Sequence, residues 1–319
     1  MPIPAISVII PTRNRARYIS EALASVFAQT FTDYEIILID DGSTDGTRQI
    51  LAPYIQQKKI QYVFQVPSGV SAARNRGISL ARAPLVAFLD SDDLFLPTKL
   101  DKQMKLFVQH PKLGFVHCSF SKFEEQGKEL GLRDTSRFSG WIYPGMLQEW
   151  SVLMAMPCML MRTEVVREVG GFDESMVWAE DLDLWRRIAW RYAVDMVPEP
   201  LVRVRVHSSS TTFERGKGAQ GFERYLEKAF AEDPELSPIF KRRVRAKMAA
   251  KLGQNLLGEG GKQEMRQVRQ HNLKALAAWP LQLSAVLGLV ASFLPLGVRR
   301  SLVARLRQQR YPAAKAEPL

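Results

Sequence analysis

The sequence predicts an α/β domain with a largely parallel sheet flanked by helices, followed by a helical, basic C-terminal region. Short apolar runs alternate with helical patterns from Ile6 to Leu89, and such spacing implies crossover connections between parallel strands. Polar, acidic loops follow several of these runs. The net charge of +11 lies in residues 214–319, which hold 20 Lys/Arg against 9 Asp/Glu, whereas residues 1–213 hold 24 of each. We therefore divide the chain into domains 1–213 and 214–319.

The composition excludes some classes of protein. Two cysteines, Cys118 and Cys158, are too few for a disulfide framework, so both are interpreted as reduced packing residues. The first residues lead directly into the apolar run 6–10, without the basic and apolar regions of a secretory signal. We therefore expect a cytoplasmic protein.

Four strands are expected in the first third of the chain, at 6–10, 35–39, 62–66 and 85–89. The helical patterns between them run from Ile19 to Phe27, from Ile50 to Ile55 and from Ser71 to Ala81. Ligands of a parallel sheet bind outside the carboxyl ends of its strands. The loops 11–14, 40–45 and 90–93 should therefore meet at one edge.

The later elements are less regular. After Pro97 we expect a helix to His110, a strand at 114–120 and an apolar run at 156–162, with a closing strand at 201–206. Residues 121–150 are interpreted as irregular, and they fit either a mobile substrate loop or a plain surface loop. Glu180 and Asp181 stand at the start of a helical pattern, where the helix dipole favours carboxylates.

The segment Asp90-Ser91-Asp92-Asp93 places three carboxylates within four residues. Crowded carboxylates raise one another's pKa unless a cation compensates, and hard oxygen ligands select Mg²⁺ or Mn²⁺. The alternative is an acidic turn that caps the helix near Pro97. The second acidic loop, 40–45, is expected at the same edge and favours a ligand site.

Six motifs stand in order along residues 5–210. They are Pro11-Thr12-Arg13-Asn14, Asp40-Asp41-Gly42-Ser43-Thr44-Asp45, Ser71 to Gly77 with Arg74-Asn75, Asp90-Ser91-Asp92-Asp93 with Pro97, Gly170-Gly171-Phe172-Asp173-Glu174, and Glu180-Asp181-Leu182-Asp183-Leu184-Trp185. Together they resemble the family 2 glycosyltransferases of GT-A fold. The region after residue 214 matches no general pattern of that family.

The resemblance implies an inverting enzyme that transfers a sugar from a nucleotide-diphosphate donor to an acceptor hydroxyl. It assigns Asp40 to the nucleotide base, Asp90 to the ribose and Asp92 to a Mg²⁺ or Mn²⁺ ion that bridges the donor phosphates. Asp181 would be the general base, with Glu180 as the alternative. The remaining donor-binding positions would be Pro11, Thr12, Asn14, Asp41, Arg74 and Ser91, and His207 would meet the metal or the diphosphate.

Uridine is the favoured base, with thymidine as the alternative. The acceptor is expected to be a glycan or a lipid-linked glycan of a cell-surface polysaccharide or lipopolysaccharide. Trp141, Trp150 and Trp178 are candidates to stack on it, although the first two fit a surface role equally well. A catalytically silent nucleotide-sugar-binding subunit is the competing function, and the intact Asp90, Asp92 and Asp181 favour the enzyme. A nucleotidyltransferase would need a glycine-rich phosphate loop, which residues 12–15 are not.

The basic region contains 18 residues without charge, Leu281 to Val298. At 1.5 Å per residue they could just cross a bilayer, but Pro295 and two glycines make a poor span. We expect an interfacial helix or helical hairpin on anionic lipid at the inner face of the plasma membrane. A bundle packed on the catalytic domain is the alternative. Nucleic acid is not expected as a partner, because no recognition motif accompanies the charge.

Overall fold

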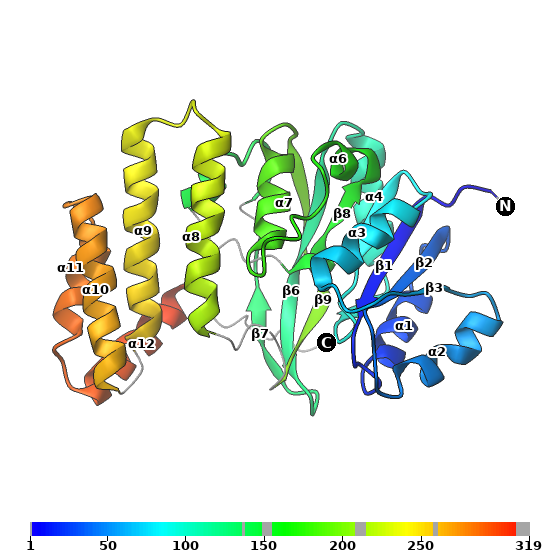
Figure 1. Ribbon diagram of the computed structural model, residues 1–319, viewed down its shortest axis with the longest axis horizontal. Helices are drawn as coiled ribbons and strands as arrows, with labels where there is room; N and C mark the ends of the chain where they lie inside the picture. Colours follow the sequence, from blue (N-terminus) through cyan, green and yellow to red (C-terminus); the bar gives the residue numbers. More distant parts are fainter. Residues whose placement is uncertain (1, 136–137, 149–154, 208–214, 258–260, 311–319) are drawn as a thin grey trace. The chain divides into compact units, whose positions relative to one another are not determined.

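The computed structural model describes residues 2–135, 138–148, 155–207, 215–257 and 261–310. The chain forms two compact units, drawn in Figure 1: Met1–Tyr143 with Val152–Arg215, and Pro144–Ser151 with Gly216–Leu319.

The first unit contains one sheet, which has nine strands in the described residues. Their order is β3-β2-β1-β4-β8-β6-β9-β5, with β7 beside β6. The strands are β1 (Ile6–Thr12), β2 (Tyr34–Asp40), β3 (Gln61–Phe64), β4 (Leu85–Phe88), β5 (Leu94–Phe95), β6 (Phe115–Glu124), β7 (Glu129–Arg133), β8 (Leu160–Arg162) and β9 (Val194–Val206). The helices of this unit are α1 (Ile19–Phe27), α2 (Thr47–Gln56), α3 (Val70–Leu80), α4 (Lys99–Gln109), α6 (Thr163–Glu168), α7 (Glu180–Ala189) and the short 3₁₀ helix η1 (Met156–Cys158).

The first half of the sheet is parallel, as the sequence predicts. β1 pairs in parallel with β2 and β4, and β2 pairs in parallel with β3. All four strands end within two residues of their predicted limits. The predicted α/β class with C-terminal helices is confirmed.

The second half of the sheet is mixed, which the sequence analysis does not predict. β8 runs antiparallel to both β4 and β6, and β5 runs antiparallel to β9, whereas β6 and β9 are parallel. β9 also begins at Val194, earlier than the expected Leu201. Pro198 and Pro200 hid this start, because proline cannot donate a ladder hydrogen bond. The register of β6 against β9 shifts beside them, at Ser119, which accommodates both prolines.

Part of the segment 121–150 is regular, contrary to expectation. β6 continues to Glu124 and forms an antiparallel hairpin with β7. The turn contains Gly127 with φ of 85°, a conformation that favours glycine. This glycine was the available sequence signal for a hairpin.

Helices cover both faces of the parallel strands. Val8 and Ile10 belong to a core cluster with residues of α1, α2 and α4. Ile9 points to the opposite face, because side chains alternate along a strand. There it meets α3 at Gly77, where a Cβ would lie only 2.4 Å from Ile9 Cγ2. Glycine therefore permits a close approach of α3 to β1.

The second unit is helical. Its elements are α5 (Gly145–Gln148), α8 (Arg215–Glu232), α9 (Pro238–Leu256), α10 (Lys262–Ala278), α11 (Leu283–Ala291) and α12 (Leu296–Arg310). Helices α9, α10 and α11 pack against one another. The buried Asn272 of α10 lies between Gly253 of α9 and Gly288 of α11, where a Cβ on either glycine would come within 2.6 Å of its amide. Among the described residues, no helix combines the length and apolar character needed to cross a membrane.

Gly77→Ala is expected to lower the free energy of unfolding by about 1–3 kcal/mol, because the added methyl overpacks the contact between α3 and Ile9. Chemical denaturation measures the change. Ser79→Ala, on the exposed side of the same helix, should stay within about 0.5 kcal/mol of the parent protein. A stabilised Gly77→Ala protein, as helix propensity alone would give, contradicts the close-packing argument.

Candidate active site

The parallel strands bring the acidic loops to one edge of the sheet. Thr12, the last residue of β1, is paired with Asp40, the last residue of β2. The N–H of Leu89 donates to the carbonyl oxygen of Ile9 at 3.0 Å, so the chain enters Asp90 beside β1. Asp40 and Asp90 therefore flank the end of β1, as predicted from the strand order.

The two consecutive carboxylates after β2 have different surroundings. Asp40 is buried and accepts hydrogen bonds from the Ser43 N–H and the Tyr62 hydroxyl, both at 2.8 Å. Asp41 accepts from Gln65 Nε2 and from two backbone N–H groups, at Ser68 and Gly69, within 2.7–2.9 Å. Asp41 thus orders the loop that enters α3, a structural task that the resemblance does not assign to it.

The loop after β1 is tied to the loop after β2. Asn14 has φ of 53°, its N–H donates to Ser43 Oγ, and its Oδ1 accepts from the Thr44 N–H. Pro11, Thr12 and Ser91 are all buried at this edge. The Thr12 hydroxyl oxygen is buried and has no partner, which is consistent with a hydrogen bond to a ligand.

Arg74 of α3 joins the acidic loop after β4 to the start of α7. Its side chain is 6% exposed, and its two terminal nitrogens pair with Asp90 Oδ1 at 2.9 Å and Glu180 Oε1 at 3.1 Å. The guanidinium carbon also lies 5.2 Å from the centre of the Phe172 ring. Both terminal nitrogens of Arg74 are thus engaged by the protein's own carboxylates, whereas the resemblance assigns this residue to the nucleotide.

The next residue, Asn75, holds the glycine motif 170–174. The side-chain oxygen of Asn75 accepts a hydrogen bond from the Phe172 N–H. Its side-chain nitrogen donates to the Phe172 carbonyl and to Glu174. Gly171 has φ of 67°, and a Cβ there would lie 2.6 Å from Asn75 Oδ1. Both the positive φ and the close approach of Asn75 require glycine at position 171. Arg74 and Asn75 therefore fix the two segments that flank the site.

Asp181 lies beside this ion-pair network. Burial, and then the neighbouring Glu180 carboxylate, raise the pKa of Asp181 to about 7, against the opposing effect of Arg74. Asp181 Oδ1 accepts the Leu182 N–H, and Ala179 before the helix has φ of 62°, an unusual backbone conformation for alanine. A carboxylate with a pKa near neutrality is suited to general base catalysis.

Asp92 is held by two side chains. Its Oδ2 accepts from Arg15 Nε at 3.3 Å and lies 2.9 Å from His207 Nε2. His207 is buried and stacks on Tyr18, with ring centres 5.1 Å apart. The structure therefore brings the two expected metal-binding residues together.

A divalent metal fits this pair with help from a ligand. No set of three or more His, Cys, Asp or Glu side chains in the described part of the chain is arranged to hold a metal ion. Mg²⁺ is usually bound by one or two carboxylates together with substrate phosphates, so one carboxylate and one imidazole suffice if a diphosphate completes the site.

The sequence analysis missed Arg205 and gave Asp93 no separate role. Arg205 of β9 donates to the Asp92 carbonyl at 2.9 Å and to Glu21 at 2.8 Å, and its N–H donates to Asp93 at 2.8 Å. Burial, and then the carboxylates of Asp92 and Asp90, raise the pKa of Asp93 well above its usual range. Both residues lie where β5 pairs with β9, and no pattern in the sequence indicated that pairing.

The predicted acceptor tryptophans are not brought together. Trp178 is partly exposed two residues before Glu180, at the site. Trp141 is 70% exposed and follows Gly140, which bridges Val194 at the start of β9. Arg205, beside Asp92, is near the other end of that strand, on the order of 30 Å away. Trp141 therefore lies at the opposite edge of the sheet. Trp150 lies outside the described residues.

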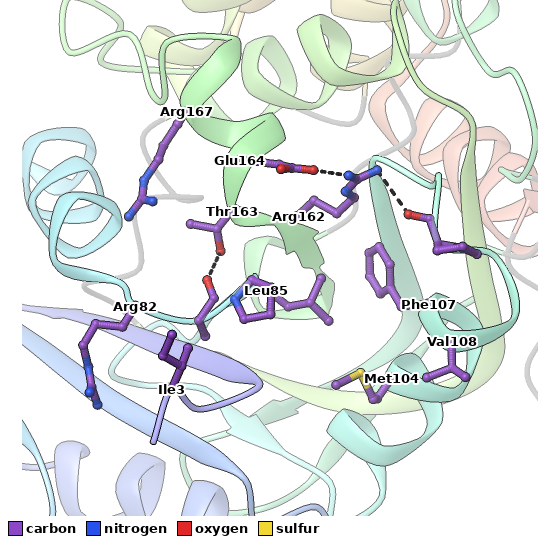
Figure 2. Close-up of a pocket in the computed structure, with 13 residues that line it drawn as sticks. Ile3, Arg82, Leu85, Met104, Phe107, Val108, Arg162, Thr163, Glu164 and Arg167 are labelled. Atoms are coloured by element: carbon purple, nitrogen blue, oxygen red, sulfur yellow. Dashed lines mark hydrogen bonds and ion pairs between the residues drawn. The ribbon is translucent and has the colours of Figure 1, made fainter. Parts of the chain in front are cut away.

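That opposite edge contains the cavity in Figure 2. Its volume is about 610 Å³, and it opens between the start of β4, helix α4 and the β8–α6 junction. Arg162 donates to the Pro111 carbonyl and pairs with Glu164, and Thr163 donates to the Ala83 carbonyl at 2.8 Å. Arg167 donates to the Ile78 and Ala81 carbonyls, and Arg82 pairs with Glu35. The polar side chains at this cavity are thus engaged in structural contacts, and Asp90 lies beyond the far end of β4.

The family model described as glycosyl transferase family 2 matches residues 7–170, and the chain belongs to this family. An uncharacterized glycosyltransferase of Rickettsia conorii is 38% identical over 208 residues, 65% of this chain but 34% of that protein. A putative teichuronic acid biosynthesis glycosyltransferase of Bacillus subtilis is 38% identical over 129 residues, 40% of this chain and 51% of that protein. The match thus spans about a third of the Rickettsia relative's length.

Solved structures share the fold. S. aureus TarS 1–349 in complex with UDP-GlcNAc matches with a TM-score of 0.64 and 17% identity over 98% of both chains. The mannosyltransferase PcManGT of Pyrobaculum calidifontis, in complex with GDP-Man and Mn²⁺, matches with a TM-score of 0.60 and 19% identity over 96% of this chain and 86% of that chain. The predicted family and GT-A fold are confirmed.

Asp181→Asn is expected to stabilise the protein at about pH 8, on the order of 2 kcal/mol, and to have little effect at about pH 4. The pKa of Asp181 is about 7 in the native state, above about 3.9 in an unfolded chain. The native state therefore binds more protons between these values, and stability falls as the pH rises.

Thermal unfolding of both proteins across this pH range measures the effect. Asp101→Asn, at a partly exposed carboxylate on α4, is the control and should not reproduce it. An equal effect of Asp181→Asn at both ends of the range contradicts the raised pKa.

Proposed function

We propose that residues 1–213 form the catalytic domain of a metal-dependent, inverting glycosyltransferase. The observation that carries the proposal is the position of Asp181. Its carboxylate, with a pKa of about 7, adjoins the ion pairs through which Arg74 connects Glu180 with Asp90. A base that works near neutral pH is thus coupled to the acidic loop at the proposed donor site.

The reaction is a single displacement. The acceptor oxygen attacks the anomeric carbon from the face opposite the diphosphate, and Asp181 accepts the hydroxyl proton. The bond from carbon to the phosphate oxygen breaks, and its electron pair leaves with the diphosphate. One base suffices, and attack from the opposite face inverts the anomeric centre. Glu180 is the alternative base, but its pairing with Arg74 at 3.1 Å favours a positioning role.

The donor residues act by binding and orientation. Asp40 and the backbone of Pro11 and Thr12 receive the nucleotide base, and Asp90 receives the ribose. Asp92, with His207, would hold a Mg²⁺ or Mn²⁺ ion at the donor site. When bound, the metal offsets the negative charge that develops on the leaving diphosphate.

The donor is proposed to be a UDP-sugar, with a dTDP-sugar as the alternative. TarS, whose structure contains UDP-GlcNAc, supports uridine, whereas PcManGT, with GDP-Man and Mn²⁺, supports including guanosine in a test. The similarity to a teichuronic acid glycosyltransferase supports a cell-surface glycan or lipid-linked acceptor. We further propose that residues 214–319 bring the enzyme to the cytoplasmic face of the membrane.

The competing function is a catalytically silent subunit that binds a nucleotide sugar. The raised pKa of Asp181 disfavours it, because a partly buried carboxylate with such a pKa lowers stability at neutral pH without serving donor binding.

A thermal-shift panel of UDP, dTDP, GDP and CDP, each with and without Mn²⁺, tests the donor site. One nucleotide is expected to raise the unfolding temperature in a Mn²⁺-dependent manner, because a ligand of the native state stabilises it. Asp92→Ala should abolish the metal-dependent part of the shift. Asp101→Ala, on the surface of α4, is the matched control and should retain it.

The same proteins distinguish an enzyme from a silent subunit. Asp181→Asn should keep the nucleotide shift and lose glycosyl transfer, by about 10³-fold or more. Full transfer activity in Asp181→Asn would remove Asp181 from the role of base. The absence of a shift with every nucleotide contradicts the proposed donor site.

A further inference from the structure

Helix α11 has its large apolar side chains on the outside. Five of them form what we call the α11 face: Leu283, Val286, Leu287, Val290 and the following Phe293. Their exposed fractions are 68%, 41%, 60%, 59% and 71%. Large aliphatic and aromatic side chains normally face the core, so a continuous stripe of this kind marks a surface that contacts something else.

The inner side of α11 is closely packed by small residues. Ala285, Gly288 and Ala291 are all buried. Ala285 belongs to an alanine cluster with residues of α9 and α10, and Gly288 faces the buried Asn272, to which a Cβ would come within 2.6 Å. The inner side of α11 therefore packs closely against α9 and α10. Turning the large residues inward would place them where only small residues fit.

Positive charge borders the α11 face. No charged residue stands between Lys274 and Arg299, whereas the segment from Lys241 to Arg310 contains 15 Lys/Arg against 2 Asp/Glu. Arg269 lies 5.1 Å from the ring centre of Phe293, at one end of the stripe. Arg243 lies 4.4 Å from the ring centre of Trp279, just before α11. The apolar side chains of the stripe suit the acyl chains of a membrane, and the arginine–aromatic pairs beside it suit the boundary with anionic headgroups.

The length of α11 determines the mode of contact. Its nine residues extend about 14 Å, less than half of the roughly 30 Å of a bilayer's hydrocarbon core. The helix therefore suits insertion parallel to the membrane plane, with one side in the acyl boundary and the other on α9 and α10.

We propose that the α11 face inserts in plane into a bilayer that carries anionic headgroups, while Arg243 and Arg269 contact those headgroups. The inference refines the membrane part of the proposed function by naming the inserted surface. It requires only that the C-terminal unit fold as described, and it does not depend on the donor or on the catalytic base.

Vesicle flotation of the full chain tests the proposal. The protein should float with vesicles that contain phosphatidylglycerol, and more weakly with phosphatidylcholine alone, and added salt should reduce the difference. Val290→Asp should weaken binding by about tenfold or more, because a charge replaces an inserted aliphatic side chain. The matched control is Val108→Asp on α4, where the valine is 74% exposed and lies outside the face. It should bind as the parent protein does.

A second measurement reports depth directly. Cys118 and Cys158 are fully buried, so an environment-sensitive dye can be attached selectively at Val290→Cys or, as the control, at Val108→Cys. The dye at position 290 should shift to the blue on vesicle addition and be quenched by spin labels on the acyl chains. The dye at position 108 should do neither.

Three results would overturn the proposal. They are no flotation with either vesicle type, equal binding of Val290→Asp and the parent protein, and a self-associated parent that Val290→Asp converts to monomers without any vesicle binding. The third would show that a second copy of the chain covers the face. The nucleotide thermal shift of the same proteins separates the two proposals: a retained shift with failed flotation rejects the membrane surface alone.

Discussion

The site depends on the two ion pairs that the buried Arg74 guanidinium makes. A charged group in the interior is tolerated only when ion pairs and hydrogen bonds compensate its loss of water. Arg74 meets that condition with Asp90 on one side and Glu180 on the other, at 2.9 and 3.1 Å. These carboxylates come from segments 90 residues apart in the sequence. One side chain thereby fixes the spacing between the proposed donor loop and the proposed base.

The same constraint gives Asp181 its properties. Glu180 is paired with Arg74. Burial is the larger cause of the raised pKa of the adjacent Asp181, and the negative charge of Glu180 is the second cause. The glycine motif supports this arrangement from the other side: Asn75 holds Phe172, whose ring lies 5.2 Å from the Arg74 guanidinium. The raised pKa of Asp181 is therefore a consequence of its burial beside this ion-pair network, and it lowers stability near neutral pH.

Sequence reasoning succeeded where local patterns determine structure. The strands β1 and β4 are short and fully buried, β2 is buried from Ile36 to Asp40, and the strand order alone placed Asp40 and Asp90 at one edge. It failed where long-range pairing decides. The antiparallel β8 and the pairing of β5 with β9 depend on segments far apart in the sequence. Pro198 and Pro200 are residues that disfavour a strand, yet β9 contains them. Trp141 was assigned by residue type alone, and its position at the opposite edge follows from Gly140 bridging Val194.

Through their ion pair, Arg74 and Glu180 are expected to act as one unit. A double-mutant cycle of Arg74→Gln and Glu180→Gln, followed by chemical denaturation, measures that coupling directly. Arg74→Gln alone should cost about 3–5 kcal/mol, because it leaves two facing carboxylates without their cation. The double variant is expected to be more stable than the two single effects combined would allow, by about 1–3 kcal/mol. Effects that add to within about 0.5 kcal/mol would contradict it.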